Sequence, residues 1–150
     1  MSVSQNAVFK CSDFRINDSG YPPGEQLATY LFNILKKDRQ VHNFENWRDC
    51  GWFFECSKNN IKLELIISYM DSNQWFLQIA PSYIPGIFGR IKRKQPSASY
   101  SDILELSKDI HNVLSSDQRF SDLRWKWDGR PDEKSPLDPL DIKNNATMHG

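Results

Sequence analysis

The segment IKLELIISYMDSNQWFLQI, residues 61–79, decides the fold of this chain. Apolar side chains occupy every second position before the polar turn at 71–73 and again after it. These positions are Ile61, Leu63, Leu65, Ile67 and Tyr69, then Trp75, Leu77 and Ile79. Because successive side chains of a strand point to opposite faces, this period of two predicts two strands that each bury one face. The segment is therefore predicted to be an antiparallel hairpin covered on one side.

A shorter alternation precedes the hairpin and extends it into a β-meander over residues 47–81. Its apolar positions are Trp52, Phe54 and Cys56. The dipeptide Asn59-Asn60 that follows is typical of a turn. Gly51 interrupts the strand-like run, so residues 48–51 are predicted to form a turn or a bulge.

Three weaker patterns surround the meander. A first strand is predicted near residues 8–16 and a last short strand over 120–127. Residues 41–47 fit either another strand or an extended connection into the meander. Alternation alone does not decide between these two for so short a run.

Two segments show helical spacing instead, over about residues 25–39 and 100–115. The apolar stripe of the first is Leu27, Leu31, Ile34 and Leu35. The stripe of the second is Ile103, Leu106 and Ile110, with Val113 or Leu114. Ser99 or Ser101 can cap the second helix, and Asp102 with Glu105 supports a capping box.

Two amphipathic helices and one sheet with an apolar face must cover one another. The predicted fold is therefore α+β, a two-layer sandwich of an antiparallel meander packed against two helices, ordered roughly β-α-β-β-β-α-β. Residues 1–127 are predicted to form this single domain. Residues 128–150 contain prolines and charges with few apolar side chains, so we expect a disordered C-terminal tail.

The overall composition excludes several classes of protein. A chain of 150 residues with 39% hydrophobic and 25% charged content fits one globular domain. Nineteen acidic residues balance nineteen basic residues, so no net field favours nucleic acid. No apolar run reaches the roughly 18 residues of a membrane span, and the first nine residues lack a secretory signal pattern. We therefore expect a cytoplasmic protein.

The sequence carries few residues suited to catalysis or metal binding. Three cysteines without an export signal predict reduced thiols, and no cofactor or metal is expected. Cys50 with His42 is a conceivable catalytic pair, and the same two residues with Cys56 make only an irregular ligand set. Carboxylate pairs, Asp49 with Glu45 or Glu55 with Glu64, are the remaining acid–base candidates, and none is expected to be catalytic.

Several short motifs together resemble a group of small, uncharacterised bacterial α+β proteins. The first is a Gly-x-x-Leu-Ala helix start at Gly24, Leu27 and Ala28, and the second is an Asp-x-Gly-Trp strand entry at Asp49, Gly51 and Trp52. A Trp-x-Leu strand at Trp75 and Leu77 follows, and then the Pro-Gly-Ile-Phe-Gly run at 85–89. The resemblance covers about residues 8–127. It implies a bacterial α+β domain and assigns no activity. Cys50 stands where the group tends to have a tryptophan, so any ligand role of that tryptophan is absent here.

Aromatic side chains, at 13% of residues, give the first candidate site. Phe53, Ile66 and Phe76 lie out of phase with the buried alternation, which places apolar groups on the second face of the sheet. With Trp47, the two phenylalanines are candidate partner-binding residues, because aromatic residues concentrate at interface hot spots.

The second candidate is an apolar and basic run within residues 81–96. Four of the nineteen basic residues fall at positions 90–94, beside isoleucine and phenylalanine. The residues assigned to partner binding are Ile87, Phe88, Arg90, Lys92 and Arg93. Because the chain as a whole is neutral, an acidic protein surface is favoured over nucleic acid or a membrane.

These observations predict a non-catalytic protein-binding module, such as a bacterial immunity or adaptor protein. The alternative is a small-molecule-binding or weakly catalytic domain with a pocket between helices and sheet, lined by Trp52 and Trp75 with Asp49 at its rim. Self-association through the second sheet face would give a homo-oligomer.

Overall fold

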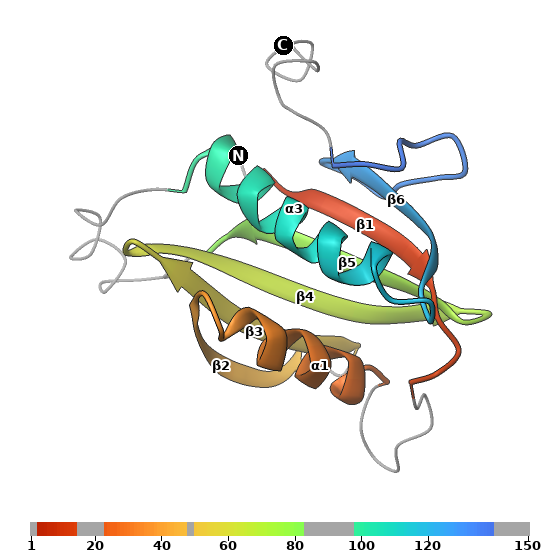
Figure 1. The fold of residues 1–150 in the computed structure, drawn as a ribbon, viewed down its shortest axis with the longest axis horizontal. Helices are drawn as coiled ribbons and strands as arrows, with labels where there is room; N and C mark the ends of the chain where they lie inside the picture. The colour runs from red at the N-terminus through yellow and green to blue at the C-terminus, as the bar shows by residue number, and fades with distance from the viewer. Residues whose placement is uncertain (1–2, 15–22, 48–49, 83–97, 140–150) are drawn as a thin grey trace.

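Six strands form one antiparallel sheet in the computed structural model of this protein, and two helices pack against it (Figure 1). The structure describes residues 3–14, 23–47, 50–82 and 98–139. In chain order the elements are β1 (Gln5–Lys10), α1 (Glu25–Leu35), β2 (Gln40–Trp47), β3 (Gly51–Lys58), β4 (Ile61–Asp71), β5 (Gln74–Pro81), α3 (Tyr100–Ser115) and β6 (Ser121–Trp127). The predicted α+β sandwich is thereby confirmed.

The strands lie in the order β2-β3-β4-β5-β1-β6, so the meander occupies one side and β1 is inserted between β5 and β6. Two-residue turns join β3 to β4 and β4 to β5. Their residues all have positive φ: 56° and 66° at Asn59 and Asn60, 51° and 62° at Ser72 and Asn73. Two such residues match the right-handed twist of a hairpin, and asparagine tolerates this conformation better than most residues.

The strand content differs from the prediction in two places. Four strands, not three, separate the helices, because residues 40–47 pair with β3 and are a strand rather than a connection. β1 covers residues 5–10 rather than 8–16, because it lies between two neighbouring strands, with Gln5 opposite both Ile79 and Trp127. A strand buried on both faces does not show clean alternation, which explains the weak signal.

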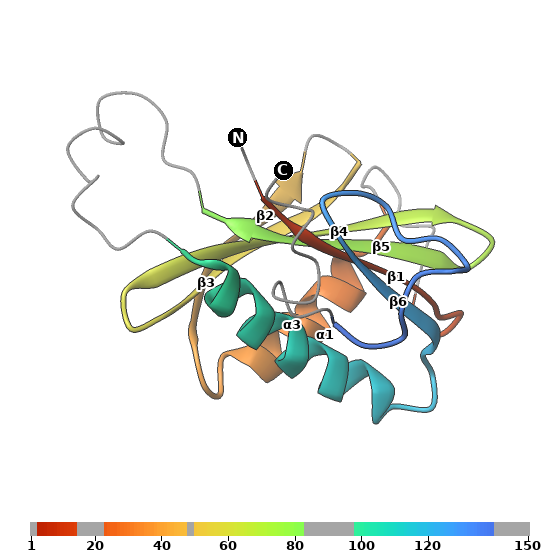
Figure 2. The same cartoon turned by 90° about the horizontal axis from the view of Figure 1, so that it is seen from above.

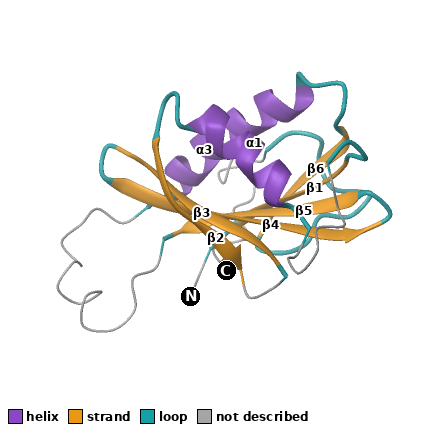
Figure 3. Cartoon of the chain, turned by 90° about the horizontal axis from the view of Figure 1, so that it is seen from below, coloured by secondary structure: helices purple, strands orange, loops and turns teal. Residues whose placement is uncertain are grey.

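Both helices lie on the same face of the sheet, as Figure 2 shows from above and Figure 3 from below. α1 packs over β2 and β3, and α3 packs over β5, β1 and β6. Their apolar stripes and the predicted alternation of β3, β4 and β5 meet in one core. Trp75 and Trp125 are its largest fully buried side chains.

The helix ends follow local rules. Ser99, one of the two predicted caps, begins α3 in a reciprocal capping box with Asp102, so the box pairs Ser99 with Asp102 and not Asp102 with Glu105. α1 ends at Leu35 and not near Arg39, because residues 36–38 turn the chain back toward β2. Gly24 is the N-cap of α1; its φ of 117° favours glycine, and a Cβ atom there would lie only 3.3 Å from ring carbons of both Trp52 and Trp75.

Gly51 opens β3 for a similar steric reason. A Cβ atom there would lie 2.4 Å from the Ile67 carbonyl oxygen of β4. The glycine predicted to break the strand therefore lies within it, where the two backbones come closest. Residues 48–49 lie outside the described part of the chain.

Residues 128–139, which we call the strap, fold around the edge of β6. On the sheet face away from the helices, the Asn6 side-chain amide donates to the Gly129 carbonyl over 2.7 Å. At the edge, the backbone N–H of Trp125 donates to the Pro136 carbonyl over 2.9 Å. Beside α3, His111 Nε2 lies 3.1 Å from Asp138 Oδ1. The prediction of a disordered tail therefore does not hold for the strap, which makes these polar contacts and buries Pro131, while residues 140–150 lie outside the described chain.

Within the described residues, no helix has the length and apolar content that crossing a membrane would require. The two helices have 11 and 16 residues, and each carries a polar face. Their apolar stripes are used inside the sandwich.

Candidate functional site

The sheet face opposite α1 and α3, here called the open face, carries the first candidate site (Figure 3). The register places Phe53 opposite Ile66 and Ser68 opposite Phe76 on neighbouring strands. None of the apolar residues on this face belongs to the core cluster beneath the helices. The out-of-phase apolar positions therefore do lie on a second face, as the sequence predicts.

These apolar side chains differ in how accessible they are. Phe53 and Ile66 are each only 8% exposed. Trp47 stacks on Phe53 with ring centroids 5.6 Å apart and planes 21° from parallel. Trp47 and Phe76 themselves are half-buried. A partner would therefore meet Trp47 and Phe76 first, because Phe53 and Ile66 are almost completely buried.

Beside Phe76 the open face is hollowed into a groove of about 500 Å³, here called the Phe76 groove. Its lining comes from the β4–β5 hairpin, the turn before β3 and the strap: Cys50, Ser68, Tyr69, Met70, Asp71, Gln74, Phe76 and Arg130. This volume lies in the range of about 300–1,000 Å³ typical of binding clefts. The groove joins three segments that are far apart in the sequence.

Cys50 and Arg130 form two sides of this groove and are both exposed. The Cys50 thiol is free and donates to the Trp47 carbonyl over 3.3 Å. Cys11 and Cys56 are free and buried, and burial raises the pKa of Cys56 to about 12. Cys50 therefore differs from the other two cysteines in being exposed.

A polar cluster occupies another part of the open face, where Glu55 and Glu64 are directly opposite one another on β3 and β4. Glu55 accepts hydrogen bonds from the Asn43 amide and the Ser82 hydroxyl. His42 Nε2 lies 3.6 Å from Glu55 Oε1. The structure therefore brings together the carboxylate pair considered from the sequence.

The two carboxyl groups titrate differently. Burial alone would raise the pKa of Glu55, but hydrogen bonds from Ser82 and Asn43 and the positive charge of His42 outweigh it, so that its pKa lies below the ordinary value. Burial, together with the negative charge of Glu55, raises the pKa of Glu64 to about 7. At neutral pH Glu55 is ionised while Glu64 is poised to exchange a proton.

Replacing Glu64 with glutamine should stabilise the protein at pH 8. Because the pKa of Glu64 is higher in the folded chain than in the unfolded chain, its stabilising contribution is full below about pH 4.5 and is lost as pH rises through 7. After allowance for the half-exposed position, Glu64→Gln should raise the free energy of unfolding by about 1–2 kcal/mol at pH 8 and by nearly nothing at pH 4.5. Urea unfolding at both pH values measures this difference.

The matched control is Glu45→Gln, an exposed carboxylate on the neighbouring edge strand. Its stability should change little at either pH, because an exposed charge remains solvated in both states. A stabilisation of Glu64→Gln that is equal at both pH values would contradict the titration and indicate a packing effect.

Other predicted catalytic and metal-binding groups are not brought together. His42 is paired with Glu55 of β3, whereas Cys50 directly precedes Gly51, the first residue of β3. Glu55 and Gly51 are four residues apart, so about 13 Å of strand separate His42 from Cys50. Among the described residues no group of three or more histidine, cysteine or acidic side chains could hold a metal ion. Asp49 lies outside the described residues, so its pair with Glu45 is not placed.

The alternative ligand site is occupied by the core itself. Trp75 is fully buried and Trp52 is 6% exposed, and both pack against Gly24 at the start of α1. The Trp75 indole N–H donates to the Cys11 carbonyl over 3.0 Å. The two indoles therefore fill the space where a pocket between helix and sheet was predicted. The predicted binding residues of the 81–96 run, from Ile87 to Arg93, lie outside the described residues.

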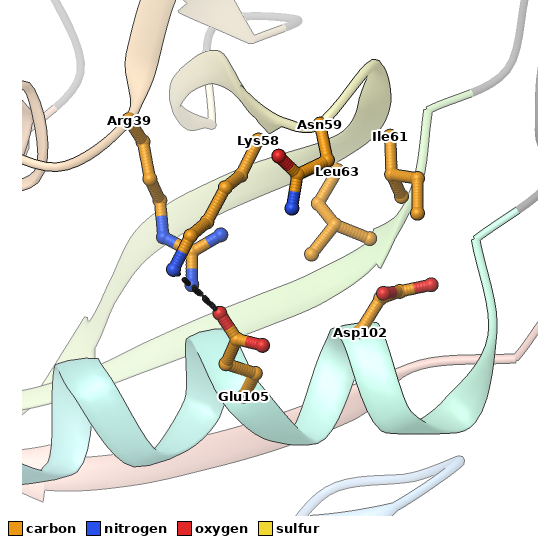
Figure 4. A pocket seen from close by; sticks show the side chains of 7 residues that line it. All are labelled: Arg39, Lys58, Asn59, Ile61, Leu63, Asp102 and Glu105. Carbon is orange, nitrogen blue, oxygen red and sulfur yellow. Dashed lines mark hydrogen bonds and ion pairs between the residues drawn. The ribbon is translucent and has the colours of Figure 1, made fainter.

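A second, smaller hollow of about 30 Å³ lies between α3 and the β3–β4 turn (Figure 4). Its main feature is Arg39, whose guanidinium lies 3.3 Å from Glu105 and 2.9 Å from Asp109. Lys58 reaches the same Glu105 over 3.0 Å. The charges are satisfied within the protein and the space fits little more than one or two water molecules, so this cluster is structural.

Sequence reasoning missed Arg130 as a site residue. The strap was assigned to a tail, and no local signal in residues 128–131 shows that the chain folds back to Asn6. Glu64 was considered only as half of a catalytic pair. Glu64 lies between Leu63 and Leu65 in the alternating strand, so the pattern already placed its side chain on the second face. That signal could have identified Glu64 as a residue of the open-face site.

No protein-family model, curated protein or solved structure matches this chain. The resemblance to bacterial α+β proteins therefore stays a prediction. The function has to be argued from the geometry of the open face.

Proposed function

We propose that this protein is a non-catalytic protein-binding module that contacts its partner through the open face of its sheet. The observation that carries this proposal is the Phe76 groove, which lies next to the half-buried aromatic ring of Phe76 on the face that neither helix covers. An uncovered sheet face that bears aromatic side chains is a common basis for protein recognition.

The composition of this surface supports a protein partner. Aromatic residues and arginine dominate binding energy at protein interfaces, and Trp47, Phe76 and Arg130 are residues of these types. Trp47 already stacks on Phe53, so part of the ordering cost of binding is already met in the free protein. The face is therefore suited to a small, preorganised contact.

The absence of an assembled catalytic constellation in the described residues supports the non-catalytic part of the proposal. Of the carboxylate pairs considered from the sequence, Glu55 and Glu64 are placed together in the described residues, and neither of the two hollows described above is lined by them. Within this proposal, the sequence resemblance favours an immunity or adaptor protein of a bacterium. A toxin or secretion gene next to the coding gene would support that narrower role.

Removing the Phe76 ring should weaken partner capture without unfolding the protein. We expect Phe76→Ser to reduce the amount of the dominant partner recovered in a quantitative pull-down from the source cells at least tenfold, because hot-spot truncations typically cost 2 kcal/mol or more of binding energy, which is about thirtyfold. The capture is read by mass spectrometry against wild-type bait.

Leu137→Ser is the matched control, since Leu137 is a 57% exposed apolar residue of the strap that is not part of the groove lining. It should capture as well as the wild type. Circular dichroism must show that both variants remain folded. A folded Phe76→Ser variant that captures its partner at the wild-type level would refute the open face as the binding surface.

A further inference from the structure

We propose that the Phe76 groove receives an acidic segment of the partner protein, with a carboxylate at Arg130 and a neighbouring apolar side chain against Phe76 and Met70. This inference rests on the proposed function and adds the chemistry of the partner. Its basis is the charge and shape of the groove as the strap and the β4–β5 hairpin form it.

Charge at the strap side of the groove favours an anion. Arg130 is exposed and forms no ion pair with any other described residue. The Lys126 ammonium is also nearby, because a Cβ atom built on Gly129 would lie 3.9 Å from its Nζ. Arg130 and Lys126 are therefore two cationic residues close to Gly129. A guanidinium binds a carboxylate with two parallel hydrogen bonds, which suits it to this role.

Two acidic residues of the strap, Asp128 and Asp132, are engaged by donors within the strap or at its base. Asp128 accepts a hydrogen bond from the Ser4 backbone N–H over 2.9 Å. Asp132 accepts from the Lys134 backbone N–H over 2.9 Å and from the Ser135 hydroxyl over 3.2 Å. These carboxylates are held by local donors, so that Arg130 remains the group that an incoming carboxylate would meet.

The rest of the groove lining offers apolar and hydrogen-bonding surface. Met70 and Phe76 are half-buried there, and Ser68 and Gln74 supply a hydroxyl and an amide. The one carboxylate of the lining, Asp71, accepts a hydrogen bond from the Ser72 backbone N–H over 2.8 Å in the hairpin turn. An acidic side chain is thus favoured at the strap and an apolar one over Phe76.

A segment of a protein fits this site better than a small molecule. The lining is contributed by a hairpin, a turn and the strap, on the sheet face that neither helix covers (Figure 3). Small-molecule sites usually enclose 70–90% of the ligand surface, whereas an open groove with few polar groups suits a peptide that continues beyond it.

Two short probe peptides test the inference on the full-length protein. They are Ac-Gly-Glu-Phe-Glu-Gly-amide and its counterpart with lysine in place of both glutamates. In ¹H–¹⁵N correlation spectra, the acidic peptide should shift the amide signals of Ser68, Phe76 and Arg130, and it should bind at least tenfold more tightly than the basic peptide. Arg130→Glu should reverse this preference.

The control is Lys134→Glu, the same change of charge at an exposed strap residue that is not part of the groove lining. It should leave the preference for the acidic peptide within twofold. Equal binding of both peptides, or an acidic preference that survives Arg130→Glu, would overturn the inference. Phenylacetate binding as tightly as the acidic peptide would do so as well, since it would identify a small-molecule site.

The same variant separates this inference from the proposed function. If Phe76→Ser abolishes partner capture while Arg130→Glu leaves capture unchanged, the open face is the binding surface and the acidic partner is wrong. If both variants capture normally, the proposed function fails as well.

Discussion

Trp75→Ala should lower the free energy of unfolding by about 4 kcal/mol, the range measured when large buried aromatics are truncated. The ring is fully buried between α1 and the sheet, where it packs edge-on against Tyr69 with centroids 4.9 Å apart. Its indole N–H also satisfies the Cys11 carbonyl over 3.0 Å. Since whole domains are stable by only about 5–15 kcal/mol, the loss is close to the limit for folding. Guanidinium unfolding followed by far-ultraviolet circular dichroism measures it.

The adjacent residue Phe76 is the internal control, because it points to the open face and is half-buried. Phe76→Ala should cost about 1 kcal/mol, in proportion to the smaller apolar area it buries. If Trp75→Ala does not fold, Trp75→Phe keeps most of the volume and should cost about 1–2 kcal/mol through the lost hydrogen bond and a small cavity. Equal losses at positions 75 and 76 would mean that the two faces are equally buried, against the structure.

Arg39→Ala should destabilise the protein by about 3 kcal/mol, because it breaks a buried ion-pair network and removes a packed side chain. The Arg39 side chain is only 4% exposed and links the end of the α1–β2 turn to Glu105 and Asp109 of α3. The partner carboxylates are 53% and 44% exposed, so they regain water when the arginine is lost, and the cost stays at the lower end for buried pairs. Chemical unfolding at neutral pH measures the loss.

Lys58→Ala is the matched control, since Lys58 reaches the same Glu105 but is 45% exposed. We expect a change below about 0.5 kcal/mol, as for most surface ion pairs. Arg39→Met, which keeps the stem without the charge, should cost about 1 kcal/mol. Similar losses for Arg39→Ala and Lys58→Ala would show that the pairing at Glu105, and not the burial of Arg39, stabilises the contact between α3 and the sheet.

Much of the candidate site could be read from alternation, but its accessibility could not. The out-of-phase positions of Phe53 and Phe76 correctly place both on the second face. Sequence does not show that Trp47 stacks over Phe53 and leaves it 8% exposed. It also does not show that the strap returns to Asn6 and brings Arg130 beside Phe76. The strap contact joins Asn6 to a residue 123 positions away, beyond the reach of any local pattern.

The sequence by itself determined the local elements of this protein. Strict alternation from Ile61 to Ile79, asparagine-rich two-residue turns and two apolar stripes of helical spacing are enough to specify a meander and the helices that must cover it. These signals are local because each depends only on the period of one strand or helix.

Only the tertiary structure decided which elements are neighbours and which surfaces remain available. It inserted β1 between β5 and β6, packed Trp52 and Trp75 into the space of the alternative pocket, and drew residues 128–139 around the edge of β6. These outcomes depend on backbone hydrogen bonds between distant segments, and every backbone carries the same donors and acceptors whatever its side chains. The groove beside Phe76 is a product of that long-range pairing.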